Sequence, residues 1–523
     1  MVLLIAACIQ STFYYSKENL FAVGCSLIGW FLTDHYVLRN YVLYRFTFSS
    51  IIIIGFSLTQ FCMPLIFTLV EGKPITFNLN LSDEVFTHSL FALLVILTAH
   101  GLYRVLQRGN TPLRDQMQTL YAKANLFTPP TDSQLWIIGF IGFLGMIGTY
   151  VTSTKFGVTD AERGFAPKVF QALIPFSYAP YFIYLKELFG KKTVITKKSL
   201  LLLAGFTVLI FIVGVGGNQR ALFVRGLVSM GLAYGLGLLL SKFSVRIFSP
   251  RNLILACLGL WVLTGPVADL GTAMVVVRSE RTDLTRKELI NKTLTAYKDK
   301  KLLSDYKKDA VASALYDEYY FDDIFLARFC NLKFNDEGLK QYHMVGSRDP
   351  EMHKISMDKI WATLPQPMLT ALKIKIDKEY LISASFGDFL YDRAGGPNAL
   401  GGFRTGQFAS TGMAAFGWSY LLFLGIGMLP IFFLLDLFVV FQLKPKNGLN
   451  FDNSLSFVGL ISITSFFMFL SLSSTSESVV NIPIFILRGL PQLILLYCIL
   501  FYITKKLSGI FNTRQLNSRV SRR

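Results

Sequence analysis

Charged side chains are scarce in this sequence, at 16% of 523 residues, whereas soluble domains carry roughly 25%. Apolar residues make up 52% of the chain, and its mean hydropathy is +0.47. Apolar runs close to the roughly 20 residues that cross a bilayer recur along most of the chain, for example at 48–70, 199–217 and 221–240. The composition therefore excludes an ordinary soluble enzyme and predicts a polytopic membrane protein.

Sequence motifs for metals and nucleotides are also lacking. There is no CxxC, HExxH or Walker A motif, and no GxGxxG between an expected strand and helix, so no metal site or other cofactor is expected. Five of the six cysteines lie in apolar runs, and Cys330 alone lies in the long polar stretch. This excludes a disulfide within that stretch. If its thiol is exposed, Cys330 is expected to react with a membrane-impermeant reagent from outside the cell.

The formal net charge of +18 has to be located before it can indicate a partner. The polar stretch 278–404 holds 21 basic and 19 acidic residues, which leaves 30 basic and 14 acidic residues in the membrane part. Of those 30, 22 fall in alternate connections between apolar runs, while the other connections hold five. This is the positive-inside pattern, a topology signal that requires no nucleic-acid partner.

The length and alternation of the apolar runs predict an all-α integral membrane protein with about twelve transmembrane helices. Both termini are then cytoplasmic, and the first span is interpreted as a retained helix rather than a signal peptide. The expected spans lie near residues 2–14, 20–37, 47–70, 86–103, 134–153, 168–185, 199–217, 219–240, 252–277, 412–440, 455–472 and 482–503.

Four parts follow from this topology. They are an N-terminal membrane bundle at 1–277, an extracytoplasmic loop domain at 278–404, C-terminal membrane helices at 405–503 and a basic cytoplasmic tail at 504–523. The bundle holds about nine helices and the C-terminal part about three. Apolar residues three and four apart predict that the loop domain is mostly helical, and its length of about 130 residues exceeds that of a simple connection. Its glycine-rich end is interpreted as a re-entry into the membrane.

Three arginines lie in or at the edge of apolar spans, where an arginine costs about 2.5–3.5 kcal/mol at the helix centre on insertion scales. Arg220 lies at the outer edge, Arg225 roughly 7.5 Å deeper, and Arg488 roughly 9 Å below the same surface. A guanidinium is permanently charged and fork-shaped, which suits bidentate contact with phosphate. We therefore expect an anion at the outer interface. The alternative is that these side chains only extend to water.

A second group of candidates lies in the re-entry segment, where Asp388, Asp392, Arg393 and Arg404 surround Tyr391. The two carboxylates are four residues apart and share one face of a helix. Beside an arginine they are suited to bind sugar hydroxyls or to supply a general base. The alternative is a solvated helix end with an ordinary balance of charge.

Two local segments add a resemblance to this layout. GGNQRALFVRGL, at 216–227, resembles a short outer turn in which an arginine opens a helix, and GGFRTGQFASTGMAAFGWSYLL, at 401–422, resembles a Gly/Arg re-entry followed by an FGW-type start of the next span. With about twelve spans, cytoplasmic ends and one large periplasmic loop, the chain resembles the bacterial O-antigen polymerase (Wzy) group within the O-antigen polymerase/ligase superfamily of lipid-linked glycosyltransferases.

The resemblance implies a metal-independent enzyme of the bacterial cytoplasmic (inner) membrane. It would transfer a growing glycan from undecaprenyl diphosphate to the next lipid-linked repeat unit at the outer face. Donor and acceptor are then undecaprenyl-diphosphate-linked oligosaccharides, and a chain-length regulator can be a further partner. The roles carried over by position are diphosphate binding by Arg220, Arg225, Arg488 and Arg404, orientation or deprotonation of the acceptor hydroxyl by Asp388 or Asp392, and sugar contact by Tyr391 and Arg393.

Three alternatives stay open. A ligase of the same superfamily shares the layout and differs mainly in its acceptor, lipid A core. A transporter or flippase for lipid-linked glycan would also be polytopic and basic inside, although the sequence shows no internal repeat of broken helices and few membrane carboxylates for ion coupling. A membrane O-acyltransferase is the third, although His88 and His100 fall near the ends of their span.

Overall fold

The computed structural model describes residues 1–523 except 110, 151–164, 195, 218–219, 245–248, 278–285, 310–316, 318, 324–325, 398, 403, 443–450, 466–473 and 521–523. Nearly all regular structure in the described residues is helical. Eight helical segments are long and apolar enough to cross a membrane by length and composition. They are Lys17–Val37, Thr47–Val70, Ser82–Leu106, Asp132–Thr149, Lys197–Gly216, Cys257–Val276, Phe408–Asp436 and Asn481–Leu507. The chain is thus a helical, membrane-embedded protein.

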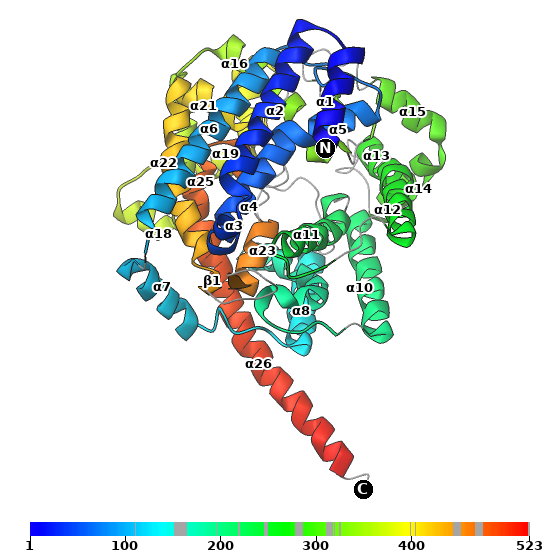
Figure 1. Ribbon diagram of the computed structural model, residues 1–523, viewed down its shortest axis with the longest axis vertical. Helices are drawn as coiled ribbons and strands as arrows, with labels where there is room; N and C mark the ends of the chain where they lie inside the picture. The colour runs from blue at the N-terminus through cyan, green and yellow to red at the C-terminus, as the bar shows by residue number, and fades with distance from the viewer. Residues whose placement is uncertain are drawn as a thin grey trace.

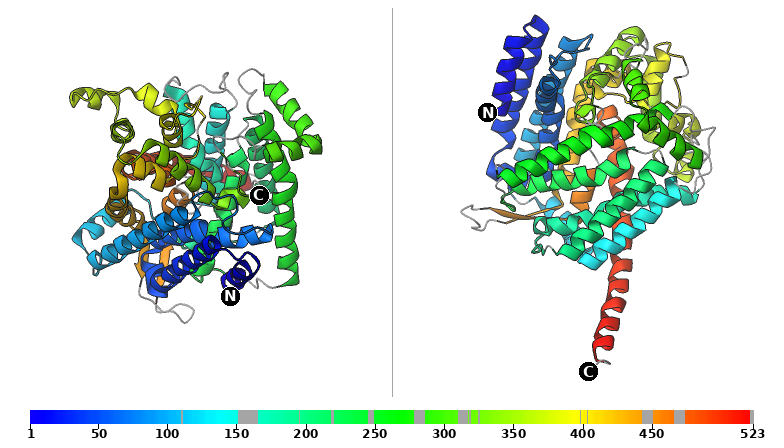
Figure 2. Two further views of the ribbon diagram at one scale, coloured as in Figure 1. Left: turned by 90° about the horizontal axis from the view of Figure 1, so that it is seen from above. Right: turned by 90° about the vertical axis from the view of Figure 1, so that its right-hand side faces the viewer.

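These segments are built from single helices or from helices joined end to end (Figure 1). They comprise α2 (Lys17–Val37), α4 (Thr47–Ser57), η1 (Leu58–Cys62), α5 (Met63–Val70), α6 (Ser82–Leu106), α8 (Asp132–Tyr150), α10 (Lys197–Gly216), α12 (Pro250–Val262), η3 (Leu263–Val267), α13 (Ala268–Val276), α21 (Phe408–Phe416), η6 (Gly417–Ser419), α22 (Tyr420–Asp436), α25 (Asn481–Ile484), η7 (Phe485–Gly489) and α26 (Leu490–Val520). The end of α26 extends beyond the rest of the molecule in both side views (Figures 1 and 2).

The remaining elements connect these segments or lie between residues 286 and 393. The connecting elements are α1 (Val2–Phe13), α3 (Asn40–Arg45), α7 (Pro112–Lys123), α9 (Phe165–Leu173), η2 (Ile174–Phe189), α11 (Arg220–Leu239), α23 (Phe457–Ser465), α24 (Ser474–Glu477) and the antiparallel strands β1 (Val439–Gln442) and β2 (Asp452–Leu455), with Val439 opposite Leu455. The polar stretch forms α14 (Arg286–Lys298), α15 (Lys300–Asp309), η5 (Leu326–Phe329), α16 (Leu332–Val345), α17 (Pro350–Trp361), α18 (Gln366–Ala371), α19 (Lys378–Ser383) and α20 (Phe386–Arg393).

Four of the predicted spans are not among the eight segments. Residues 2–14 form the 12-residue helix α1, and residues 219–240 form α11, whose apolar part is Arg225–Leu239. Residues 168–185 form part of α9 and the 3-10 helix η2, where Pro175 and Pro180 lack the N–H that α-helical bonding needs. Of residues 455–472, 466–472 lie outside the described part. The count of about twelve therefore stays a prediction.

Helix α8 packs along a row of glycines, of which the first two face η2 and the last two face α9. The row consists of Gly139, Gly142, Gly145 and Gly148. A Cβ placed on Gly142 would lie 2.2 Å from the backbone nitrogen of Ser177, and one on Gly139 would lie 2.3 Å from the Pro180 ring. Helix α8 and η2 therefore meet with almost no side chain between them, as small residues allow in membrane helices.

Gly142→Ala is expected to lower the free energy of unfolding by about 1–3 kcal/mol, the usual cost of overpacking. The reason is that the new methyl group meets backbone atoms, which cannot rotate away. Gly101→Ala is the matched control, because nothing lies within 4 Å of a Cβ at that position. Thermal unfolding of the purified protein in detergent measures the difference, and equal midpoints for the two variants would contradict this packing.

Asp436, at the end of α22, is a fully buried acid in the membrane part. Its carboxylate accepts hydrogen bonds from the backbone N–H groups of Phe48 at 2.9 Å and Ser49 at 3.1 Å, and from the Ser49 hydroxyl at 2.6 Å. These N–H groups belong to the first turn of α4, whose donors have no partner within the helix. Asp436 thus caps α4 and joins it to α22.

The helices of the polar stretch pack against the membrane part. Helix α16 contacts α21 and α6, and α14 contacts α13. A Cβ on Gly338 of α16 would lie 2.3 Å from the hydroxyl oxygen of Ser410 in α21, so these two helices touch closely. The domain boundaries predicted at 278 and 404 stay predictions.

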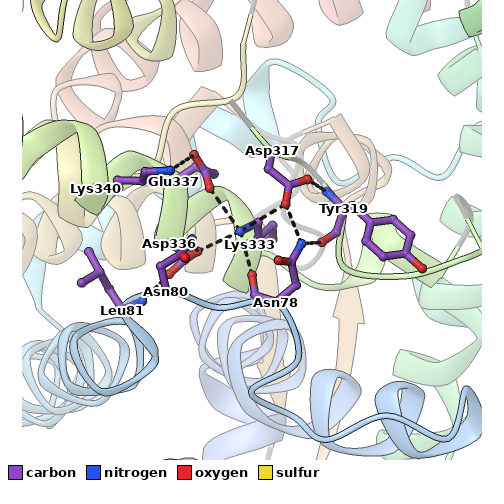
Figure 3. A network of polar contacts seen from close by, with 9 residues as sticks. All are labelled: Asn78, Asn80, Leu81, Asp317, Tyr319, Lys333, Asp336, Glu337 and Lys340. Atoms are coloured by element: carbon purple, nitrogen blue, oxygen red, sulfur yellow. Dashed lines mark hydrogen bonds and ion pairs between the residues drawn. The ribbon is translucent and has the colours of Figure 1, made fainter. Parts of the chain in front are cut away.

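A buried network around Lys333 joins α16 to the connection between α5 and α6 (Figure 3). The Lys333 Nζ lies 2.7 Å from the Asn78 carbonyl oxygen, 3.0 Å from Asp336 and 3.1 Å from Glu337. The Asp336 carboxylate also accepts the Leu81 N–H at 2.7 Å. Burial lowers the pKa of Lys333, but the two carboxylates outweigh it and the net shift of this pKa is upward. The ammonium group therefore stays charged.

The predicted labelling of Cys330 required an exposed thiol, and the thiol of Cys330 is buried. Its side chain is 3% exposed, and burial raises the pKa of the thiol well above its ordinary value. Both effects suppress reaction with a thiol reagent. Native Cys330 is therefore not expected to be labelled, which corrects the prediction made from the sequence. Ser304, exposed on α15, is a suitable position for an introduced cysteine.

Candidate functional site

The predicted re-entry segment starts within the short helix α20, which begins with a capping box. The Ser385 hydroxyl accepts the Asp388 N–H at 3.0 Å, and the Asp388 carboxylate accepts the Ser385 N–H at 3.3 Å. This reciprocal pair satisfies donors that a helix start leaves free and explains why the chain turns into a helix here. It also fixes the Asp388 side chain, which is fully buried.

Arg404 binds the same carboxylate from the other side. Its backbone N–H donates to Asp388 Oδ1 at 2.9 Å, and its guanidinium Nη1 lies 3.3 Å from the same oxygen. The guanidinium also donates to the Ala399 carbonyl at 2.8 Å and lies 4.2 Å from the ring centroid of Tyr391. The structure therefore brings Asp388, Tyr391 and Arg404 into contact.

Glu477 reaches the start of α20 from the segment that precedes the last span. Its carboxylate accepts the Phe386 N–H at 2.8 Å and also bonds the Gly387 N–H. Its carbonyl oxygen accepts the Thr411 hydroxyl of α21 at 3.0 Å. Glu477 thus ties together α20, α21 and the entry to α25. Loss of contact with water raises the pKa of Glu477, and these N–H groups and the positive charge of Lys359 only partly oppose it.

Lys359, on α17, lies against the same turn. Its ammonium donates to the Ala384 carbonyl at 2.9 Å and lies 4.3 Å from the ring centroid of Phe386 and 4.9 Å from that of Phe389. In the described part of the chain, no carboxylate oxygen lies within 4.0 Å of this ammonium. Removal from water lowers the pKa of Lys359 to about 8, and the charges of Glu477 and Asp388 offset only part of that effect.

We call Lys359, Asp388, Arg404 and Glu477 the α20 cluster. It contains two positive and two negative groups, so its formal charge is balanced. Both oxygens of Asp388 accept hydrogen bonds within the protein, which leaves this carboxylate little capacity to bind an external hydroxyl. The geometry therefore gives the cluster a positioning role: it holds the start of α20 against α17 and α24.

The free energy of unfolding is expected to rise as the pH increases from about 8 to about 10.5, because the pKa of Lys359 is about 8 in the folded protein and near 10.5 when unfolded. Between these values the unfolded chain binds more protons than the folded chain, so the slope is positive. Lys359→Met should remove this part of the rise. Lys354→Met, at an exposed position on the same helix, is the control. Thermal unfolding midpoints across this pH range test the expectation, which an unchanged slope in Lys359→Met would contradict.

Asp392 and Arg393 lie on the solvent-exposed side of α20. Arg393 pairs with Asp349 at 2.8 Å and with Glu351 at 2.9 Å. Asp392 is exposed, and the residues that the structure describes donate no hydrogen bond to its carboxylate. Although Asp388 and Asp392 are one helical turn apart, only Asp392 is open to an external hydroxyl.

The three predicted membrane arginines lie on other elements. Arg220 begins α11, and its side chain is outside the described residues, whereas Arg225 is partly buried on the same helix. Arg488 is exposed on η7, a π-helical turn within the last candidate span, and such turns occur frequently at functional sites. No carboxylate oxygen of the described residues lies within 4.0 Å of the Arg488 guanidinium. That these arginines meet at one anion site stays a prediction.

Sequence reasoning assigned no role to Lys359 or to Glu477. Neither lies in a motif, since Lys359 is one of many loop lysines and Glu477 follows a serine-rich run. Among the described residues, no group of three or more His, Cys, Asp or Glu side chains is placed to hold a metal ion. Comparison of the chain with protein-family models, curated proteins and solved structures gave no match.

Proposed function

We propose that this protein is a polysaccharide polymerase of the O-antigen type, which joins undecaprenyl-diphosphate-linked repeat units at the outer face of the bacterial inner membrane. The observation that carries the proposal is Arg488. A permanent charge on a membrane-crossing helix is costly and is usually paired or functional, yet this guanidinium has no carboxylate within 4.0 Å in the described residues. A diphosphate at the level of the lipid headgroups supplies the missing anion.

The proposed reaction breaks the bond between the donor's first sugar and undecaprenyl diphosphate and forms a glycosidic bond to the acceptor hydroxyl. Negative charge develops on the leaving diphosphate, where Arg225 and Arg488 stabilise it, joined by Arg220. Asp392 is the better candidate to receive the hydroxyl proton, because its carboxylate is exposed while that of Asp388 is occupied.

The α20 cluster has a positioning role in this proposal. The Arg404 guanidinium is engaged by Asp388 and by the Tyr391 ring, so it orders the re-entry segment beside the diphosphate site. Arg393, paired with Asp349 and Glu351, orders the solvent-exposed side of α20, where acceptor sugars would approach. In this proposal both termini are cytoplasmic and residues 278–404 lie outside, as the alternation of basic residues predicts.

A gel of surface and lipid-linked polysaccharide from a deletion strain, beside its parent, tests the proposal. Single repeat units in place of a ladder are the expected result. A ladder that remains on undecaprenyl diphosphate but is missing from its final acceptor would identify a ligase instead. Units that accumulate on the cytoplasmic face would identify a flippase.

A further inference from the structure

The bend between α17 and α19 presents apolar side chains outward. We call residues 357–375 the α17–α18 elbow. Met357 and Trp361, one turn apart on α17, are 38% and 39% exposed, and Met368 and Leu372, one turn apart at α18, are 49% and 55% exposed. Four large apolar side chains exposed within one short segment make this bend a candidate surface for an apolar partner.

The elbow is a fixed structure, so these side chains are held outward. Leu369 is fully buried and anchors α18. The Lys378 ammonium donates to the Leu364 carbonyl across the bend. At the end of α18 the Ile374 N–H bonds the Leu369 carbonyl at 2.9 Å, the long bond of a Schellman cap.

Lysines flank the apolar side chains. Lys373 and Lys375 are both exposed, and the sequence contains no Asp or Glu between residues 359 and 376. Lys373 adopts a left-handed backbone conformation, with φ of 56°, at the cap position where glycine is favoured. A lysine is less favourable than glycine in this conformation.

The membrane that the chain itself spans is the occupant that fits this chemistry. Figure 1 shows α18 at the margin of the molecule, beyond α22, and α22 belongs to a candidate span. Tryptophan is enriched at the boundary between headgroups and acyl chains, and exposed lysines beside apolar side chains suit anionic headgroups.

We propose that the α17–α18 elbow docks on the bilayer surface, with Trp361, Met368 and Leu372 at the boundary of the acyl chains and Lys373 and Lys375 against anionic headgroups. Lys359 lies two residues before Trp361 on α17. Docking therefore fixes the end of this helix, and with it the α20 cluster, at the lipid surface. The inference requires a membrane-embedded chain and is independent of the glycan chemistry.

The test uses the full chain in nanodiscs of equal parts phosphatidylcholine and phosphatidylglycerol. With the native cysteines replaced, single cysteines at Met368, Leu372 and Ser304 carry a nitroxide label, and accessibility to oxygen and to a water-soluble nickel complex gives the depth of each label. Labels at 368 and 372 are expected roughly 5–10 Å below the headgroups, and the label at exposed Ser304 of α15 in water. Nickel accessibility at 368 and 372 equal to that at 304 would overturn the proposal and leave a protein as the partner of this surface.

Two further variants keep the test decisive. Lys373→Gly preserves the cap and, combined with Lys375→Gln, should make the labels shallower in phosphatidylglycerol-containing nanodiscs but not in pure phosphatidylcholine. If the two substitutions leave the label depth unchanged in phosphatidylglycerol-containing nanodiscs, the proposed headgroup contact is overturned. In the chain with its native cysteines, Trp361→Phe should remove part of the fluorescence that brominated lipids quench. Unchanged quenching would overturn the docking even if the cysteine-free chain does not fold.

Discussion

Glu477→Ala is expected to lower the free energy of unfolding by roughly 2–4 kcal/mol, because it leaves buried N–H donors without their charged acceptor. Those donors are the N–H groups of Phe386 and Gly387, and the nearby Lys359 loses a compensating negative charge. Thermal unfolding of the purified protein in detergent or nanodiscs measures the loss. Glu379→Ala, at an exposed position on α19, is the control and should change little.

A double-mutant cycle separates charge from hydrogen bonding at this position. Glu477→Gln keeps an acceptor oxygen but removes the negative charge, so it should cost less than Glu477→Ala. In a Lys359→Met background its cost should fall further, because no buried ammonium then remains without compensation. Additive effects of the two substitutions would show that Lys359 and Glu477 do not interact. If Glu477→Ala were as stable as the control Glu379→Ala, the arrangement of the α20 cluster would be contradicted.

Arg488→Ala is expected to reduce the rate of glycan elongation by about 10²–10³-fold, the usual effect of removing one donor from a developing negative charge. The reason is that the proposed leaving group is a diphosphate, which a guanidinium binds with two parallel hydrogen bonds. Arg488→Lys should retain part of the activity, since it keeps the charge but loses the fork. The length distribution of lipid-linked glycan on a gel, at equal amounts of protein in the membrane, measures the effect.

Two comparisons make this result specific. Arg225→Ala should behave like Arg488→Ala, because both arginines are proposed to contact the same diphosphate. Arg108→Ala removes an exposed arginine just after α6, within the basic connections, and should leave chain length unchanged. Normal chain length in both Arg225→Ala and Arg488→Ala would refute the diphosphate site.

The sequence predicted those parts of the fold that depend on composition over a window of residues. Hydropathy located the segments that contain α2, α4, α6, α8, α10, α13, α22 and α26, because burial in lipid requires an apolar run whatever its neighbours are. It could not predict that residues 174–189 form a 3-10 helix. That segment contains two prolines and packs against Gly139 and Gly142 of α8, which lie elsewhere in the sequence.

The same distinction applies to the candidate site. Asp388, Tyr391 and Arg404 lie within 17 consecutive residues, so a pattern of charge and glycine was enough to group them. Lys359 and Glu477 are 118 residues apart, and only the packing of α17 and α24 around the start of α20 brings them near each other. No local signal distinguishes Lys359 from the exposed lysines around it, because what sets it apart is its surroundings.

The Lys333 network imposes an order on the assembly of the protein during its synthesis. Asn78 and Lys333 are 255 residues apart, which corresponds to roughly 10–50 s of translation at about 5–20 residues per second. During that interval α5 and α6 have been made, but the connection between them has no partner for the carbonyl of Asn78 or the N–H of Leu81. The contacts of this connection are therefore completed only after the chain through α16 has been made, and a chain that stops before residue 333 leaves the connection between α5 and α6 without them.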